Sequence, residues 1–371
     1  MKKKIIILII LIFLLIGISL GSYFYVIKNI NKETKSTKTK TVINSSTNEE
    51  IVLNDESYEI TKGGTYTFTG KISNGSITTN TDDEVKLILN SVTINNDNGA
   101  SIEINGNGNT NIVLEGENTL TSGTSYSNQD VDGVIYSKAD LTISGDGTLN
   151  VTSNYEDGIV SKDDLEILGG VINVNSMDDG IKGKDSVTIE NANVTINAGG
   201  SGIKATNEED FEKGYIEIKS GTFNINTTDN GIKSITKLTI NGGTFNISSS
   251  ECLESTYIVI NDGDISINAS DDGINASVKS TFMTPTIEIN GGNINITMGQ
   301  GDTDGLDSNG NLYINGGSLN INAQSPFDYD GEGKLNGGTV IVNESEVTEL
   351  SNQMMGGPGG MPGDMGPRGR Y

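Results

Sequence analysis

Acidic side chains recur at one position of a repeated sequence, where their spacing suits metal binding. The segments NYEDGIV, MDDGIKG and ASDDGIN each place carboxylates directly before a Gly-Ile pair. Gly158, Gly180 and Gly202 follow one another at steps of 22 residues. Carboxylates stacked at strand spacing, about 4.8 Å, repel each other by about 1 kcal/mol per pair even in water. Hard divalent cations stabilise such a ladder, and calcium takes its oxygen ligands from carboxylates, carbonyls and amides.

The candidate metal ligands are the acidic residues at this position of the repeat. For any single Asp in such a place a turn residue is the favoured interpretation, since Asp and Asn favour turns. Turns do not need glutamate or paired carboxylates, so the ladder as a whole favours metal. We expect calcium in the densest stretches, 251–272 and 302–330. The candidate ligands are Asp178, Asp179, Glu251, Glu254, Asp271, Asp272, Asp304, Asp307, Asp328 and Asp330.

Composition excludes several other chemistries. The net charge is −25, from 49 acidic and 24 basic residues, and the only arginines are Arg368 and Arg370. This balance excludes a nucleic-acid partner, which requires clustered positive charge. There is no His, which excludes Ser-His-Asp and Cys-His catalysis and an ordinary zinc site. The single cysteine, Cys252, cannot form an intrachain disulfide and is expected to be a buried small residue.

The elements that must position these carboxylates are short strands. Runs with alternating apolar residues, such as 165–167 and 172–174, flank a glycine corner at Gly169 and Gly170, and a third short run follows at Ile181. Three strands per coil at a repeat near 22 residues predict an all-β fold, the right-handed parallel β-helix. Insertions at 205–214 and 276–285 leave the coil at the same point. They are expected to build a binding face, although plain surface loops are the alternative.

The chain divides into four parts. Residues 1–28 contain Lys2, Lys3 and Lys4 before the uncharged run 5–27, which predicts an uncleaved membrane helix rather than a cleaved signal, with the body outside a bacterial cell. A flexible polar spacer follows at 29–50. The β-helix occupies 51–350, and a disordered Gly/Pro/Met tail occupies 351–371. We expect a monomer on the cell surface or in the medium.

Several segments carry a resemblance to a known family. They are ITKGGTYTFTGKISNG (60–75), VKLILNSVTI (85–94), SSECLES (249–255), ASDDGINA (269–276), GDTDGLDSNGNLYINGG (301–317) and FDYDG (327–331). Together they resemble the calcium-dependent carbohydrate-binding β-helix domains of secreted bacterial proteins, which are similar in architecture to family 9 pectate lyases. The resemblance implies bound calcium and an acidic polysaccharide ligand such as polygalacturonate, with cellulose as a further candidate. Cys252 departs from the family pattern, which has Gly there.

Four functions remain open at this point. The first is a binder in which calcium bridges protein and uronate carboxylates. The second is a calcium-dependent lyase, whose base would be Lys182, Lys204 or Lys233, although neighbouring carboxylates raise the pKa of a lysine. The third is an inverting glycosidase that uses paired aspartates such as Asp178 with Asp179, or Asp271 with Asp272. Adjacent strand residues point to opposite faces, which disfavours the third. The fourth is a structural surface protein.

Overall fold

The described part of the chain consists of β-strands and the turns between them. The computed structural model describes residues 40–45, 50–300 and 303–352. Within these ranges there is no α-helix, and hence no helix long and apolar enough to cross a membrane. The expected membrane helix at 1–28, most of the spacer and the tail beyond residue 352 lie outside the described residues.

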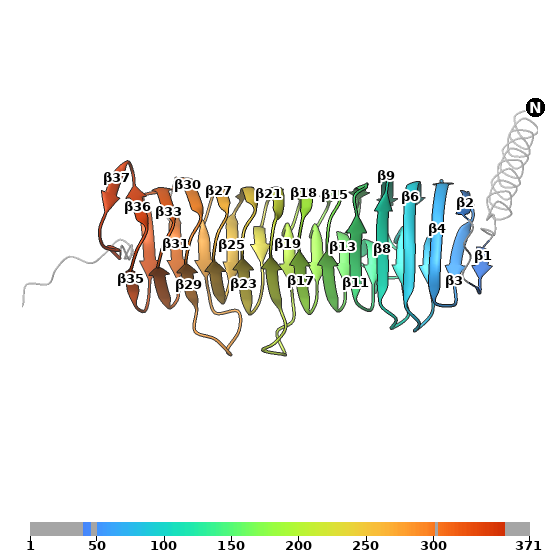
Figure 1. Ribbon diagram of the computed structural model, residues 1–371, viewed down its shortest axis with the longest axis horizontal. Helices are drawn as coiled ribbons and strands as arrows, with labels where there is room; N and C mark the ends of the chain where they lie inside the picture. The colour runs from blue at the N-terminus through green and yellow to red at the C-terminus, as the bar shows by residue number, and fades with distance from the viewer. Residues whose placement is uncertain (1–39, 46–49, 301–302, 353–371) are drawn as a thin grey trace, which may run out of the picture. The chain divides into compact units, whose positions relative to one another are not determined.

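The strands form a solenoid with three faces, stacked in chain order as Figure 1 shows. Among the described residues every strand pairing is parallel except the final one, between β36 and β37. The predicted parallel β-helix is therefore confirmed, and its handedness stays a prediction.

The first and second faces belong to one 24-stranded sheet, because the long strand β6 pairs with both β8 and β9. The first-face strands are β2 (Glu50–Asn54), β4 (Gly64–Ile72), β6 (Val85–Asn96), β8 (Thr110–Glu115), β11 (Leu141–Gly145), β14 (Asp164–Ile167), β17 (Ser186–Ile189), β20 (Tyr215–Ile218), β23 (Lys237–Ile240), β26 (Tyr257–Ile260), β29 (Thr286–Ile289), β32 (Asn311–Ile314) and β35 (Gly333–Leu335). The second-face strands are β9 (Glu117–Ser122), β12 (Thr148–Thr152), β15 (Val171–Ser176), β18 (Ala192–Ala198), β21 (Gly221–Thr227), β24 (Thr244–Ser249), β27 (Asp264–Ala269), β30 (Asn293–Met298), β33 (Ser318–Asn322), β36 (Thr339–Val342) and β37 (Ser345–Val347).

The third face is a separate sheet of 13 strands. Its strands are β1 (Lys40–Ile43), β3 (Ser57–Ile60), β5 (Ile77–Thr79), β7 (Ile102–Ile104), β10 (Gly133–Ser137), β13 (Asp157–Ser161), β16 (Ile181–Gly183), β19 (Ile203–Ala205), β22 (Asn230–Lys233), β25 (Glu251–Ser255), β28 (Ile274–Ala276), β31 (Asp304–Ser308) and β34 (Ser325–Tyr329). Strand β1 lies within the segment expected to be spacer, so the β-helix begins at Lys40 rather than at residue 51.

The core is a stack of like residues, because each coil repeats the apolar pattern of the one before it. Leu141 lies opposite Leu165, and Leu165 opposite Val187, all fully buried. The rings of Phe223 and Phe245 stack with centroids 4.6 Å apart. Each fully buried side chain of this kind stabilises the fold by about 1.5–3 kcal/mol. Cys252 is also fully buried, as expected.

Glycine is required at the corner between the first and second faces. Gly243 has φ +115°, which L side chains rarely adopt, and a Cβ there would lie 3.0 Å from the carbonyl oxygen of Gly221 in the preceding coil. In the coil where Ala192 replaces the glycine, the preceding Asn191 takes the positive φ of 56° instead. Asn tolerates this conformation better than other non-Gly residues.

The two insertions are loops of 206–214 and 277–285, which follow β19 and β28. Both leave the corner between the third and first faces, and Figure 1 shows them protruding on the same side of the solenoid. The expectation that they leave the coil at one point is confirmed.

Candidate metal centre

Two columns of side chains run along the third face. The face column is defined by strand register, and its members lie opposite one another on successive strands. They are Lys182, Lys204, Lys233, Glu254, Asn275, Asp307 and Asp328. The corner column lies three residues earlier in each coil, where the chain enters the third face. Its members are Asp179, Ser201, Asn230, Glu251, Asp272, Asp304 and Ser325.

Carboxylates of the corner column join one coil to the next. The backbone N–H of Asp179 donates to Oδ1 of Asp157 at 2.9 Å, and the N–H of Ser201 donates to Oδ1 of Asp179 at 2.9 Å. Further along, the N–H of Asp304 donates to Oδ1 of Asp272 at 3.2 Å. An acidic residue at this position therefore has a structural role, because it accepts a backbone hydrogen bond that the turn leaves free.

Lysines neutralise the carboxylates in the N-terminal half of these columns. Nζ of Lys182 lies 3.2 Å from Oδ2 of Asp132 and 3.9 Å from Oδ2 of Asp179, and it also contacts Asp157. Burial disfavours the charge on Lys182, but Asp157 and Asp132 outweigh it and hold the pKa of this amine above its ordinary value. An amine held charged in this way is a poor general base.

The other two candidate bases are also paired. Nζ of Lys204 lies 2.9 Å from Oδ2 of Asp179. Nζ of Lys233 lies 2.8 Å from Oε2 of Glu254 and donates to Oδ1 of Asn230 at 3.1 Å. The three lysines are therefore side by side in register, and each holds a carboxylate of the fold.

The pair Asp178 and Asp179 corrects one expectation from the sequence. These residues lie in a turn rather than on a strand, and their carboxylate oxygens lie within 4.8 Å of each other and of a carboxylate oxygen of Asp157. Their carboxylates therefore converge, whereas adjacent residues on a strand would point to opposite faces. Lys182 and Lys204 already pair with Asp157 and Asp179 of this trio, which leaves it less suited to a divalent cation.

A second carboxylate trio lies at the start of the first face, and sequence reasoning missed it. Oxygens of Asp140, Asp163 and Asp164 lie within 4.8 Å of one another. The hydroxyl of Ser186 donates to Oδ1 of Asp164 at 2.6 Å. Burial, together with neighbouring Asp185 and Asp140, raises the pKa of Asp163 to about 6. The signal in the sequence was an Asp directly before the first buried leucine of the strand in two successive coils, Asp140 before Leu141 and Asp164 before Leu165.

The C-terminal half of the two columns carries carboxylates without matching lysines. Glu254 is neutralised, since Lys279 from the second insertion contacts it in addition to Lys233. In the described ranges no lysine forms an ion pair with Glu251, Asp272 or Asp307. This half of the third face therefore has an excess of negative charge.

Burial and the excess negative charge together raise the pKa of two carboxylates in this half. Burial raises the pKa of Asp272 to about 7, and the charge of Asp307 contributes. Burial likewise raises the pKa of Asp307 to about 7, with Asp304 and Asp328 contributing. These carboxylates are destabilised as anions, and either a proton or a bound cation would relieve that.

Asn275 places an unpaired oxygen among these carboxylates. Its side chain is 7 % exposed, and Nδ2 donates to Oδ2 of Asp272 at 3.0 Å. Its Oδ1 is buried and has no hydrogen-bond donor within the described structure. A buried carbonyl left unsatisfied costs about 1–3 kcal/mol, and it lies between Glu254 and Asp307 in the face column. Carboxylate and amide oxygens are the donors that calcium prefers, so the residues present fit such an ion by donor type. Glu251, Asp272 and Asp307 do not form one of the carboxylate trios of the described residues whose oxygens lie within 4.8 Å of one another.

The remaining predicted ligands lie at the margins of this cluster. Asp304 and Asp328 are half-buried, on β31 and β34. Asp271 and Asp330 are exposed in turns, and Asp302 lies outside the described residues. Asn275 was not predicted as a ligand, although its register position between two predicted acidic residues could have indicated it.

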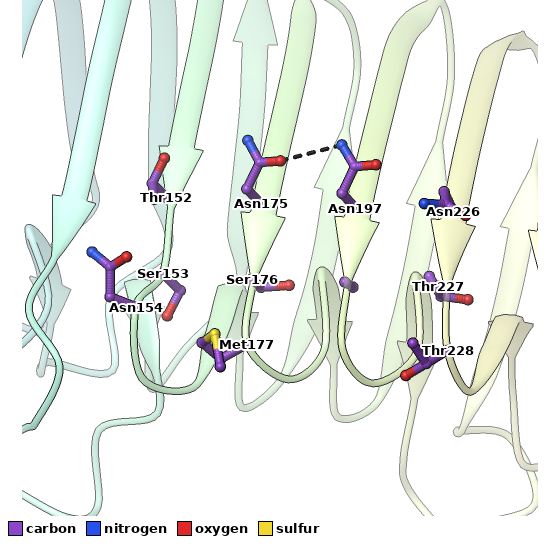
Figure 2. A pocket seen from close by; sticks show the side chains of 11 residues that line it. Thr152, Ser153, Asn154, Asn175, Ser176, Met177, Asn197, Asn226, Thr227 and Thr228 are labelled. Atoms are coloured by element: carbon purple, nitrogen blue, oxygen red, sulfur yellow. Dashed lines mark hydrogen bonds between the residues drawn. The ribbon is translucent and has the colours of Figure 1, made fainter.

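A shallow groove runs along the corner between the second and third faces, close to these columns. Two adjoining hollows, of about 410 Å³ and about 570 Å³, share Thr227 and Thr228. Figure 2 shows the first hollow, where Nδ2 of Asn197 donates to Oδ1 of Asn175 at 3.2 Å. The described residues that line the two hollows include no charged side chain, although a fifth of the chain is charged.

The groove lies next to the acidic cluster along the chain. Ser250 and Ser270 line the second hollow, and Glu251 and Asp271 follow them directly. A polymer lying in the groove would therefore pass beside the corner column. Outward-facing asparagines on the second face form three hydrogen-bonded pairs, which are separated in register by Thr195 and Ser266. The pairs are Asn150–Asn173, Asn224–Asn246 and Asn295–Asn320.

Comparisons with known proteins agree with this architecture. The family model described as "Carbohydrate-binding domain-containing protein" matches residues 54–300 and 254–351. A carbohydrate-binding domain-containing protein of Acetivibrio thermocellus is 35% identical over 143 residues, which are 36% of this chain. The match spans half the length of that relative.

A solved structure is also similar. It is that of the polysaccharide lyase-like protein from C. thermocellum, a gadolinium derivative, with a TM-score of 0.51 and 34% sequence identity. The similarity covers 57% of this chain and 90% of that one.

Proposed function

Because the chain belongs to the family of carbohydrate-binding domain-containing proteins, we propose that it binds an acidic polysaccharide of the polygalacturonate type through calcium. The metal ligands are drawn from Glu251, Asp272 and Asp307, together with the amide oxygen of Asn275. Bound calcium supplies positive charge that protein carboxylates and uronate carboxylates share. The protein's own residues hold the ion in place and hydrogen-bond the sugar.

The observation that carries this proposal is the unpaired Oδ1 of Asn275. This buried carbonyl oxygen has no hydrogen-bond donor and lies beside Asp272 and Asp307, which is explained if it coordinates a cation. A purely structural ladder would be expected to use lysines, as the same columns do at Lys182 and Lys204. The change from lysine to uncompensated carboxylate therefore favours a binding role in the C-terminal half.

The net charge supports the same partner. A protein of net charge −25 repels a polyanion unless cations lie between them. A polyuronate lies outside cells, in keeping with the export expected from the N-terminal sequence.

The corner groove supplies the sugar contacts in this proposal. Its Asn, Thr and Ser side chains carry both donors and acceptors, which suits sugar hydroxyl groups. Asn175 and Asn197 use only one hydrogen-bonding function each in their mutual bond, so others remain for a ligand.

The test is co-sedimentation of the protein with insoluble polygalacturonate in calcium and again in EDTA. We expect retention in calcium and release in EDTA. A folded protein that fails to sediment in calcium would contradict the acidic-polysaccharide proposal, and retention that EDTA does not change would contradict the metal bridge. An insoluble polymer that is not a carbohydrate, tested in parallel, controls for trapping in the pellet.

A further inference from the structure

Two phenylalanines differ from all the others in the described part of the chain. Phe68, Phe223, Phe245 and Phe327 lie in the core. Phe211 and Phe282 are instead 58% and 53% exposed. Their ring centroids lie 6.1 Å apart at 61°, an edge-to-face contact.

These two rings belong to the two insertions. Phe211 lies in the loop after β19 and Phe282 in the loop after β28, and the two intervening coils, with β22 and β25, have short turns at this corner. The ring contact therefore joins coils that are three apart. Val278, 62% exposed, adds apolar surface in the second loop.

The first loop is held rigidly by a buried asparagine. Asn207 is 5% exposed, and its Oδ1 accepts from the backbone N–H of Glu209 at 3.0 Å and of Asp210 at 3.1 Å. Its Nδ2 donates to Oδ1 of Asp185 at 2.6 Å. The backbone on the N-terminal side of Phe211 is thereby fixed to the body of the solenoid.

The second loop is fixed in a similar way. The N–H of Ser280 donates to Oγ1 of Thr256 at 2.8 Å, and Oγ of Ser280 accepts from the N–H of Phe282 at 3.2 Å. Lys279 contacts Glu254 on the third face. Exposed aromatic rings on a preformed backbone lose little entropy when they bind a ligand.

We propose that Phe211 and Phe282 form a stacking platform for an uncharged pyranose ring, a second carbohydrate site that does not depend on metal. The C–H face of a pyranose is apolar and packs on aromatic rings, while its hydroxyl groups donate to acceptors around it. Carboxylates of Glu208, Glu209 and Glu212 flank Phe211 in the same loop and supply such acceptors. Their negative charge disfavours a uronate at this place.

The size of the platform argues against a protein partner. Two aromatic rings bury about 300–500 Å², whereas a specific protein–protein interface buries at least about 1,200 Å². A sugar ring matches the smaller area. A second copy of this chain is therefore a poorer occupant than a glycan.

The test uses the absence of tryptophan from the chain. Phe282→Trp places the chain's single tryptophan on the platform, where its emission can be excited selectively over that of tyrosine. We expect soluble neutral oligosaccharides of β-1,4-glucan, β-1,4-xylan and β-1,4-galactan, titrated in EDTA, to include at least one that shifts its emission saturably. Oligogalacturonate in EDTA should not. Adding Phe211→Ser to the reporter variant should weaken that response about tenfold, whereas adding Val52→Ser, which removes an exposed apolar side chain on β2, away from both proposed sugar sites, should not.

No response to any neutral oligosaccharide, in a variant with wild-type circular dichroism, would overturn the proposal. So would a response that Phe211→Ser leaves unchanged. Sedimentation equilibrium that shows a dimer lost in Phe211→Ser would overturn it in favour of self-association. The readout is independent of the proposed calcium site, because it is made in EDTA and should survive Asp272→Asn.

Discussion

Nζ of Lys233 lies 2.8 Å from Oε2 of Glu254, its register partner on the next strand. At this pair the face column changes from lysines to acidic and amide side chains. On one side of it the face column holds Lys182 and Lys204. On the other side it holds Asn275, Asp307 and Asp328. One column thus supplies lysines as counter-ions in its N-terminal half, whereas within the described ranges Asp307 and Asp328 in its C-terminal half form no ion pair with a lysine.

The first prediction concerns Asn275. Replacement by leucine removes the unpaired oxygen and keeps the volume, so calcium affinity should fall at least tenfold. Replacement by aspartate keeps an oxygen and adds charge, so it should raise calcium affinity while lowering stability in EDTA. Isothermal titration calorimetry measures both. Equal affinities in the two variants would show that this side chain is not a ligand.

The second prediction is a pH dependence with a defined sign. Without metal, Asp272 and Asp307 have pKa values raised to about 7, against about 3.9 in an unfolded chain. The native state then binds more protons between about pH 4 and pH 7, so the free energy of unfolding contributed by these groups falls as pH rises through this window.

Calcium requires the deprotonated carboxylates. Its effect on the melting temperature should therefore be small at pH 5 and large at pH 8. Thermal unfolding followed by circular dichroism, with calcium and with EDTA at both pH values, makes the comparison. A gain in melting temperature of equal size at the two pH values would contradict the assignment of these two residues as ligands.

The third prediction separates the lysine half from the metal centre. Lys182→Met leaves the buried carboxylate of Asp157 without its counter-ion, and breaking a buried pair in this way costs about 3–5 kcal/mol. Denaturant unfolding should show this loss. Lys334→Met, which breaks the exposed pair with Glu332, should leave stability unchanged and serves as the control.

Calcium affinity should not change in Lys182→Met as long as the protein is folded. Unaltered stability in that variant would mean that the N-terminal half of the column does not depend on its lysines.

The fourth prediction concerns neighbouring glycines at one corner. Gly243→Ala should destabilise the fold by about 1–2 kcal/mol because its φ is +115° and the new Cβ would crowd Gly221. At Gly242 a Cβ would come no nearer than 3.5 Å to any heavy atom, so Gly242→Ala should be close to neutral. Chemical denaturation compares the two variants, and equal effects would contradict the stacked-corner explanation.

The fold could be predicted because its determinants are local and repeated. Alternating pairs such as Leu165 and Ile167, followed at a fixed step by Val187 and Ile189, specify strand, face and register together. The start of the solenoid could not be predicted. Lys40–Ile43 is polar or β-branched without a recognisable repeat, and only pairing with β3 makes it a strand.

The candidate site could be located from the sequence, but which of its carboxylates are neutralised by lysines could not be predicted. The position of the carboxylates in the repeat predicts that they stack, which the two columns confirm. Which of them are neutralised depends on lysine contacts across coils and from an insertion, such as Lys279 on Glu254, and these are not periodic. Asp178 and Asp179 converge because they lie in a turn, whereas adjacent residues of a strand would point to opposite faces.

The most direct test of the central proposal is calcium-dependent retention on insoluble polygalacturonate by the double variant Asp272→Asn/Asp307→Asn. Both changes keep the side-chain shape and remove charge. Glu166→Gln, an exposed carboxylate on the first face, is the matched control. We expect the double variant to lose retention in calcium, with circular dichroism unchanged, and the control to bind as the wild type does. Wild-type retention by the folded double variant would contradict the proposal that these carboxylates hold the bridging calcium.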